Sequence, residues 1–294
     1  MRPSDPRLCD FAPRAYVIAY KEDTDTLCGT LTDQGFDCQL LRQAPNPDYR
    51  GYSPSYLCLL NHTRAWRDII DRQQTAAIFE ADFVPVKRMG RLPVPCDLKP
   101  SRPGAGAESE TPQPIDTLGV AWLYTCAPQV YSVSAAGKAI GYSASTVAYL
   151  VSPKAAEVLL EHAESIRQNP GPTSYSSWDS EMESKLRASG LECYLPFRNY
   201  GEHGGKPNAE HRLANLSSEH RADVLYGAMA FRPPYAEADG NPGLKIFLTR
   251  AIGRIKGLGR LLLNRYVRRN VLRGSSTPGR MLRFALSRQL TLRL

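Results

Sequence analysis

An apolar segment in the first third of the chain carries two carboxylates inside it. The segment, residues 75–86, reads TAAIFEADFVPV, and the two acids are Glu80 and Asp82. Its aromatic and β-branched residues predict a buried strand. An unpaired ionised carboxylate costs several kcal/mol in such a place. The pair is therefore expected where the strand leaves the core and meets a cation, and a divalent metal is the simplest such cation.

The spacing of the two acids suits a metal that binds oxygen. In a regular strand the side chains alternate, so Glu80 and Asp82 are expected on one face, with Ala81 pointing away. Hard cations such as magnesium or manganese take carboxylate and phosphate oxygens together, so this pair could hold a diphosphate through the metal. Acid-x-acid triplets also occur at strand ends where the acids are solvated or paired with arginine. Both interpretations stay open at this point.

The elements around this strand predict an α/β domain with a mainly parallel central sheet. Residues 15–20 read as a buried strand, residues 21–34 as a helix that Gly35 ends, and residues 36–41 as a second strand. A turn-rich link then leads to a helix over residues 56–73, with Ser55 as its expected cap. This order is typical of parallel sheets, whose ligand sites lie at the carboxyl ends of the strands. Glu80 and Asp82 are therefore suitably placed for a ligand.

Three other positions carry polar groups that suit either a ligand or ordinary structure. Asp179 and Glu181 lie near a predicted helix start, where the helix dipole favours acids whatever their function. A loop over residues 199–212 gathers glycines, histidines, an asparagine and a lysine, which suits a polar ligand or a plain surface loop. His62, on an apolar helical face, fits a hydrogen-bonded core histidine as well as a ligand contact.

Four blocks of sequence follow one another in a specific order: LLNHTRAW, AAIFEADFVPV, STVAYLVSPKAAEVLL, and SSWDSEMESKL with YLPF. In this order they resemble glycosyltransferase family 25, the lipopolysaccharide-modifying and collagen-type galactosyltransferases. The family's Glu-Asp-Asp metal motif matches Glu80, Ala81 and Asp82, and its later acidic block matches Asp179. The resemblance covers roughly residues 15–211. It implies a GT-A (Rossmann-like) fold, a nucleotide-activated sugar donor and a divalent metal.

The resemblance also implies roles for individual residues. Glu80 and Asp82 would hold Mn²⁺ (or Mg²⁺), which neutralises the leaving diphosphate. Asp179, with Glu181 as the second candidate, would take the proton of the acceptor hydroxyl, so that the sugar is transferred with inversion. The expected donor contacts are Tyr20, Lys21, His62, Ala81 and His203. A UDP-sugar is the first candidate donor, and the acceptor is expected to be a glycan or glycolipid of the cell surface, such as lipopolysaccharide.

The chain departs from the family pattern at three places. Ala81 replaces the middle acid, Asn61 stands before His62 where the family has serine, and residues 19–21 replace the usual Asn-Leu-Arg of the first strand. The two outer carboxylates are still present. A second function therefore stays open: a catalytically inactive glycosyltransferase-like protein that acts as a binding or scaffold subunit at the membrane. Metal-dependent hydrolysis of a nucleotide sugar distinguishes the two.

The basic charge of the chain is concentrated at its C-terminal end. No acidic residue follows Asp239, whereas thirteen lysines and arginines do, and the whole chain has a formal net charge of +8. We expect two units, a glycosyltransferase domain over residues 14–239 and a basic amphipathic tail over residues 240–294. One helical face of the tail is apolar: Leu248, Ala251, Ile252, Ile255, Leu258, Leu262 and Tyr266. The expected membrane-binding residues, towards its flanks and back, are Arg250, Arg254, Lys256 and Arg260.

This pattern is typical of a helix that lies on an anionic membrane surface. Gly253, Gly257 and Gly259 weaken a helix in water, so we expect this one to order on lipid. Nucleic acid would explain the arginines but not the apolar face, so it is not the expected partner. The chain lacks a span of ~20 apolar residues and a secretory signal, and its seven scattered cysteines indicate neither disulfides nor a zinc site. We therefore expect a cytoplasmic protein, peripheral on the inner face of the membrane.

Overall fold

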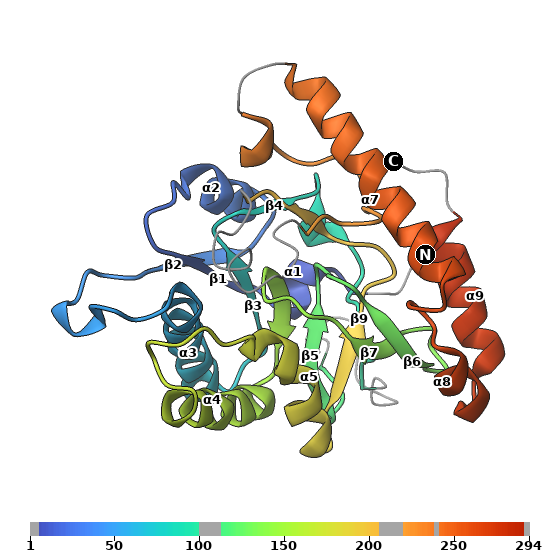
Figure 1. The fold of residues 1–294 in the computed structure, drawn as a ribbon, viewed down its shortest axis with the longest axis horizontal. Coiled ribbons are helices and arrows are strands. Elements are labelled where there is room, and N and C mark those ends of the chain that lie inside the picture. The colour runs from blue at the N-terminus through green and yellow to red at the C-terminus, as the bar shows by residue number, and fades with distance from the viewer. Residues whose placement is uncertain (1–5, 100–112, 206–219, 238–240, 291–294) are drawn as a thin grey trace, which may run out of the picture.

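The computed structural model describes residues 6–99, 113–205, 220–237 and 241–290 (Figure 1). Its strands are β1 (Arg14–Ala19), β2 (Asp37–Arg42), β3 (Ala76–Glu80), β4 (Phe83–Pro85), β5 (Leu118–Trp122), β6 (Gln129–Val133), β7 (Ala139–Tyr142), β8 (Ala148–Val151), β9 (Glu192–Leu195) and β10 (Gly201–His203). Its α-helices are α1 (Leu8–Phe11), α2 (Asp25–Asp33), α3 (Pro54–Arg72), α4 (Pro153–Gln168), α5 (Trp178–Ala188), α7 (Pro242–Leu262), α8 (Arg269–Gly274) and α9 (Pro278–Gln289).

Eight strands form one sheet in the order β2-β1-β3-β8-β5-β9-β7-β6. β2, β1 and β3 are parallel neighbours, as are β5 and β9, whereas β8 and β7 run antiparallel to the strands beside them. Six strands therefore point one way and two point the other. The predicted α/β class is confirmed, with a sheet that is mixed in its pairing. α2 and α3 connect β1, β2 and β3, because parallel neighbours need a crossover.

Side chains of the central strands alternate between two hydrophobic cores. Tyr16 and Ile18 of β1 belong to the core that α3, α4 and α5 cover, while Ala15 and Val17 belong to the core with α1 and α2. Ile78 of β3 likewise joins the first of these cores. Since both faces are covered, these strands are apolar at successive positions rather than at every second one. This explains the uninterrupted apolar runs that predicted them.

α3 begins at Pro54, and its cap is Ser53 rather than the expected Ser55. The hydroxyl of Ser53 accepts the amide of Tyr56 at 3.1 Å, and proline suits the first helical position because its fixed φ is already helical. Ser55 lies inside the helix, where its hydroxyl accepts the amide of Ser176 at 3.2 Å. It therefore fastens the segment before α5 to the start of α3.

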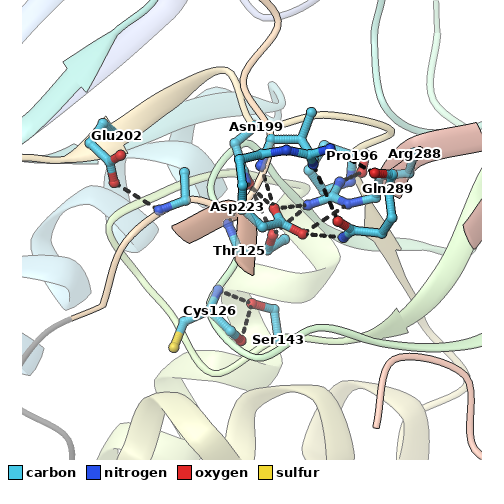
Figure 2. Close-up of polar contacts among 12 residues, drawn as sticks. Thr125, Cys126, Ser143, Pro196, Asn199, Glu202, Asp223, Arg288 and Gln289 are labelled. Atoms are coloured by element: carbon cyan, nitrogen blue, oxygen red, sulfur yellow. Dashed lines mark hydrogen bonds and ion pairs between the residues drawn. The ribbon is translucent and has the colours of Figure 1, made fainter. Parts of the chain in front are cut away.

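The basic tail packs against the rest of the chain. Tyr266 and Phe284 lie in the first hydrophobic core, and Arg288 is only 1% exposed. Figure 2 shows Asp223 receiving hydrogen bonds from the tail, with Nη2 of Arg288 at 2.6 Å from its Oδ1 and the amide of Gln289 beside it. The tail thus shares a core with the residues before it. The division at residue 240 stays a prediction.

α7 is a continuous helix of 21 residues although Gly253, Gly257 and Gly259 lie in its second half. Gly253 and Gly257 lie where the helix meets the domain. A Cβ on Gly253 would lie 2.5 Å from the carbonyl oxygen of Ala222, and one on Gly257 would lie 2.8 Å from Cβ of Asp223. The expectation that glycine would leave this helix unformed away from lipid is thus corrected, because these glycines allow a close approach whose packing stabilises the helix. In the part of the chain that the structure describes, no helix is both long and apolar enough to cross a bilayer.

Candidate active site

The chain turns directly after Glu80, the last residue of β3. Ala81 and Asp82 form the turn to β4, so the predicted alternation of Glu80 and Asp82 along one strand face is wrong. The amide of Ala81 donates to the carbonyl of Ile18 on β1 at 2.9 Å, which holds the turn against the sheet. Both acids nevertheless line one cavity of about 350 Å³ at this end of the sheet.

Asp82 is paired with His203, which lies 121 residues further along the chain. Oδ2 of Asp82 is 3.0 Å from Nε2 of His203. The contact arises because β10 pairs with β4, and the amide of Gly204 donates to the carbonyl of Asp82 at 2.8 Å. The other oxygen, Oδ1, is buried and has no hydrogen-bond partner among the described residues. A buried carboxylate oxygen without a partner is an open position for a cation.

The two groups of this pair shift each other's pKa. Burial acts to raise the pKa of Asp82, but the charge and hydrogen bond of His203 outweigh burial and hold this pKa below its ordinary value. Burial acts to lower the pKa of His203, but the charge and hydrogen bond of Asp82 raise it to about 9. The pair on its own is therefore an imidazolium beside a carboxylate at neutral pH. A cation that binds both groups has to displace the proton of His203.

Glu80 has different partners from Asp82. Its Oε1 accepts the hydroxyl proton of Thr146 at 2.6 Å and lies 3.5 Å from Nε2 of His62. Among the described residues, Cys58, His62 and Glu80 form the group in which three possible metal ligands lie within 4.8 Å of one another. A thiol, an imidazole and a carboxylate together suit zinc better than magnesium. Glu80 and Asp82 are thus separate ligand positions on one cavity wall.

His62 is fully buried behind Glu80 and is oriented by two aromatic side chains. The hydroxyl of Tyr149 accepts the indole N–H of Trp66 at 2.9 Å and lies 3.0 Å from Nδ1 of His62. This contact holds the ring of His62 through Nδ1, while Nε2 faces Glu80 and has no hydrogen-bond partner among the described residues. His62 does not line the cavity walls. Its place supports a role in positioning Glu80 rather than the predicted contact with the donor.

Asp179, the first predicted base, faces the same cavity as the two metal-ligand candidates. It lies in the first turn of α5 and lines the cavity with Glu80, Asp82 and His203. Glu181, the second predicted base, is exposed on α5 and does not line this cavity. Successive residues of a helix are about 100° apart, so the side chain of Glu181, two residues after Asp179, points away from the cavity. Only the first of the two candidates is therefore near the metal-ligand candidates.

Two further cavities meet the first one at Asp82. One, of about 330 Å³, is lined by Tyr20 and Ala81, and the other, of about 740 Å³, by Ala81 and Arg232. Tyr20 and Ala81 thus lie on cavity walls, as a donor contact requires. Lys21 is exposed, with Nζ 4.9 Å from the centre of the Tyr20 ring, and lines none of these three cavities.

Arg221 is a site residue that the sequence did not reveal. Its Nη1 donates to the carbonyl of His203 at 3.0 Å and its Nη2 to the carbonyl of Gly205 at 3.1 Å. Its guanidinium lies over the ring of Tyr235, 4.4 Å from the ring centre. Arg221 therefore fixes the end of β10, where His203 lies, and the residues directly after it. A single arginine in a polar stretch has no sequence signal that marks this role.

Cys126 and Cys58 line the first cavity, although the sequence indicated no role in a site for either of them. Sγ of Cys126 lies 3.0 Å from Nδ1 of His220 in the cavity wall. Burial raises the pKa of Cys126 to about 11, so this thiol is neutral and a poor nucleophile. Cys58 stands four residues before His62, and this spacing on one helical face is the signal that would have suggested a shared ligand.

No protein-family model matches this chain, and no curated protein matches it. Among solved structures, it is similar to the crystal structure of a glycosyltransferase involved in the glycosylation of the major capsid of PBCV-1. The match has 9% sequence identity and a TM-score of 0.36, and it covers 62% of this chain and 81% of that one. This likeness is distant, and membership of family 25 stays a prediction.

Proposed function

We propose that this chain is a metal-dependent glycosyltransferase that moves a sugar from a nucleotide-sugar donor to a glycan or glycolipid acceptor. The observation that carries this proposal is the pairing of Asp82 with His203 at the point where three cavities meet. A carboxylate and an imidazole offer two ligands to a divalent cation. They leave its other positions to the diphosphate oxygens of a donor and to water.

The residues present fit Mn²⁺ (or Mg²⁺) bound by Asp82 and His203. The buried, unpartnered Oδ1 of Asp82 supports this assignment, and Glu80, held by Thr146, is placed to contribute through water. The bound cation would supply Lewis-acid stabilisation of the charge that develops on the leaving diphosphate. The cavity lined by Tyr20 and Ala81 is assigned to the nucleotide, with a UDP-sugar as the first donor to test.

Asp179 is assigned as the base. It shares the cavity with Asp82 and His203, so an acceptor hydroxyl bound there can pass its proton to this carboxylate as it attacks the anomeric carbon. Attack from the side opposite the diphosphate inverts that carbon. Glu181 is not part of this assignment, because it is exposed outside the cavity.

The experiment is the release of nucleoside diphosphate from a panel of nucleotide sugars, with Mn²⁺ and with chelator. The variants Asp82→Asn and His203→Gln are expected to lose turnover by roughly 100-fold or more, since each removes a ligand of the cation. The matched control is Asp116→Asn, which changes an acid that is 89% exposed and pairs with Lys99.

Two outcomes would contradict the proposal. Metal-dependent turnover that persists in Asp82→Asn would overturn the metal assignment. A parent chain that is folded, binds Mn²⁺ and releases no diphosphate from any donor would favour the inactive binding or scaffold subunit instead. Circular dichroism of each variant distinguishes lost chemistry from lost structure.

A further inference from the structure

The outer side of α7 carries a row of exposed apolar side chains, which we call the α7 stripe. Its members are Leu244, Phe247, Leu248, Ile252, Ile255 and Leu262, from 50% exposed for Leu248 to 80% for Leu262. At about 100° per residue, all six positions fall on one side of the helix. Figure 1 shows α7 at the rim of the molecule, in orange. Because a surface helix normally turns such a stripe to the core, a continuous exposed one indicates a partner.

The opposite side of α7 holds the helix on the domain. Arg250 is 5% exposed, and its Nη1 lies 2.6 Å from Oε2 of Glu202 and donates to the carbonyl of Ala222 at 2.7 Å. Gly253 and Gly257 bring the helix backbone against the same segment. A buried ion pair and two close backbone contacts therefore set the rotation of α7. The stripe cannot turn inward without breaking them.

This orientation corrects the predicted membrane-binding residues. Arg250 is buried in the ion pair, and Nη2 of Arg254 donates to a main-chain carbonyl at the end of α9 at 2.6 Å, so both side chains serve internal contacts. Arg260 is half-buried, and Lys256 is exposed as expected. Tyr266 is buried in the core, beyond the end of the helix, and does not belong to the stripe.

We propose that the α7 stripe docks on an anionic lipid bilayer, with α7 lying in the plane of the surface. Exposed Lys245 and Lys256 are eleven residues, about three helical turns, apart, so they lie on one flank of the stripe. No acidic residue follows Asp239, so no carboxylate of the tail repels lipid phosphates. Apolar side chains enter the headgroup boundary, while lysines beside them meet anionic headgroups.

The positive charge of the tail disfavours a second copy of the chain as the partner of the α7 stripe, and the apolar centre of the stripe disfavours a nucleic acid. A second copy would bring one cationic tail against another, which like-charge repulsion disfavours. A nucleic acid needs cations at the centre of its contact surface, whereas the centre of the stripe is Leu248, Ile252 and Ile255. The proposal concerns binding alone and is independent of sugar transfer.

The experiment is co-sedimentation of the full chain with phosphatidylcholine vesicles that do or do not contain about 30% phosphatidylserine. The chain is expected to sediment with the anionic vesicles, and less so as salt is raised. The double substitution Phe247→Glu with Ile255→Glu is expected to weaken this binding roughly tenfold or more, since it places two charges in the stripe. The matched control is Leu40→Glu, at a leucine of β2 that is 40% exposed.

Every outcome bears on the proposal. Equal sedimentation of the parent and the double variant would overturn it, as would a parent that ignores anionic vesicles. Light scattering that shows a parent dimer and a monomeric double variant would assign the stripe to a second copy. Binding to a DNA duplex in preference to vesicles would assign the tail to nucleic acid. Both substituted positions are exposed, so thermal unfolding is expected to confirm that the variants are folded.

Discussion

Arg250 and Glu202 form a buried ion pair that joins α7 to the strand that carries His203. The nitrogen and oxygen are 2.6 Å apart, and the two side chains are 6% and 0% exposed. Oε1 of the same glutamate accepts the amides of Ala222, at 2.8 Å, and of His203, at 3.1 Å. The carboxylate of Glu202 therefore holds both His203, a candidate metal ligand, and α7, the helix with the exposed apolar stripe.

Removing the charge of Glu202 should destabilise the fold. Glu202→Gln leaves the guanidinium of Arg250 buried without a counter-charge, a change that typically costs about 3–5 kcal/mol. The free energy of unfolding in urea measures this loss. As a control, Glu164→Gln breaks an exposed ion pair with Arg167 and is expected to leave stability unchanged. Equal effects of the two substitutions would contradict a structural role for the buried pair.

A methyl group on Gly205 should disturb the candidate metal position. Its Cβ would lie 2.1 Å from Oδ2 of Asp82 and 3.0 Å from Nε2 of His203, so Gly205→Ala must displace the carboxylate. We expect Mn²⁺ affinity, measured by calorimetry, to fall roughly tenfold or more. Gly227→Ala is the control, because its Cβ would meet no atom within 4 Å. Unchanged Mn²⁺ affinity in Gly205→Ala would count against binding at this pair.

Two glycines of α7 should respond in opposite ways to alanine. Helix propensity alone favours either substitution by up to about 1 kcal/mol. Gly259 has open space around it, so Gly259→Ala should raise Tm. At Gly253 the new Cβ would lie 2.5 Å from the carbonyl oxygen of Ala222, so Gly253→Ala should cost about 1–3 kcal/mol. If both raise Tm, the close contact of α7 with the domain is not as described.

The acid stability of the fold should depend on Asp223. Burial acts to raise the pKa of this carboxyl, but the charge and hydrogen bonds of Arg288 outweigh burial and hold the pKa below its ordinary value. The ionised group therefore stabilises the fold above the ordinary aspartate pKa of about 3.9, and this contribution is lost as pH falls through the lower folded value. Asp223→Asn should lower Tm at neutral pH.

The difference in Tm between the parent and Asp223→Asn should then shrink below about pH 4. Thermal unfolding followed across acid and neutral pH measures it. An exposed control, Asp116→Asn, should show little difference at any pH, since its carboxylate is 89% exposed. A constant difference for Asp223→Asn would mean that its charge does not stabilise the tail.

Local sequence patterns predicted much of the sheet and of the helices around it. β1, β2, α3 and β3 follow from apolar runs and turn residues. The run over residues 75–86 was expected to be one strand, but β3 ends at Glu80 and β4 begins at Phe83. The cap of α3 was misplaced by two residues, because two serines flank Pro54 and only the proline's position inside the helix decides between them. The antiparallel direction of β7 and β8 depends on pairings between distant segments, which no local pattern encodes.

The candidate site was predicted only in part, for the same reason. Asp82 follows an apolar strand and Asp179 lies at a helix start, and short stretches of sequence are enough to predict both positions. The orientation of a side chain relative to another element cannot be predicted from such stretches. Tertiary packing placed His62 behind Glu80 and left Glu181 outside the cavity. It also brought His203 to 3.0 Å from Asp82.

The tail shows most clearly which features can be predicted from the sequence and which depend on tertiary packing. The sequence by itself predicted an amphipathic helix without acidic residues after Asp239, because periodicity and charge can be read along the chain. Its bounds, Pro242–Leu262, and its formation away from lipid were decided by the tertiary structure. Only the tertiary structure decided which side faces the domain. The apolar side of a surface helix usually faces the core, but here Arg250 is buried against Glu202. Gly253 lies close to the carbonyl oxygen of Ala222, and Gly257 lies close to the side chain of Asp223. These specific contacts fix the helix with its leucines and isoleucines outward.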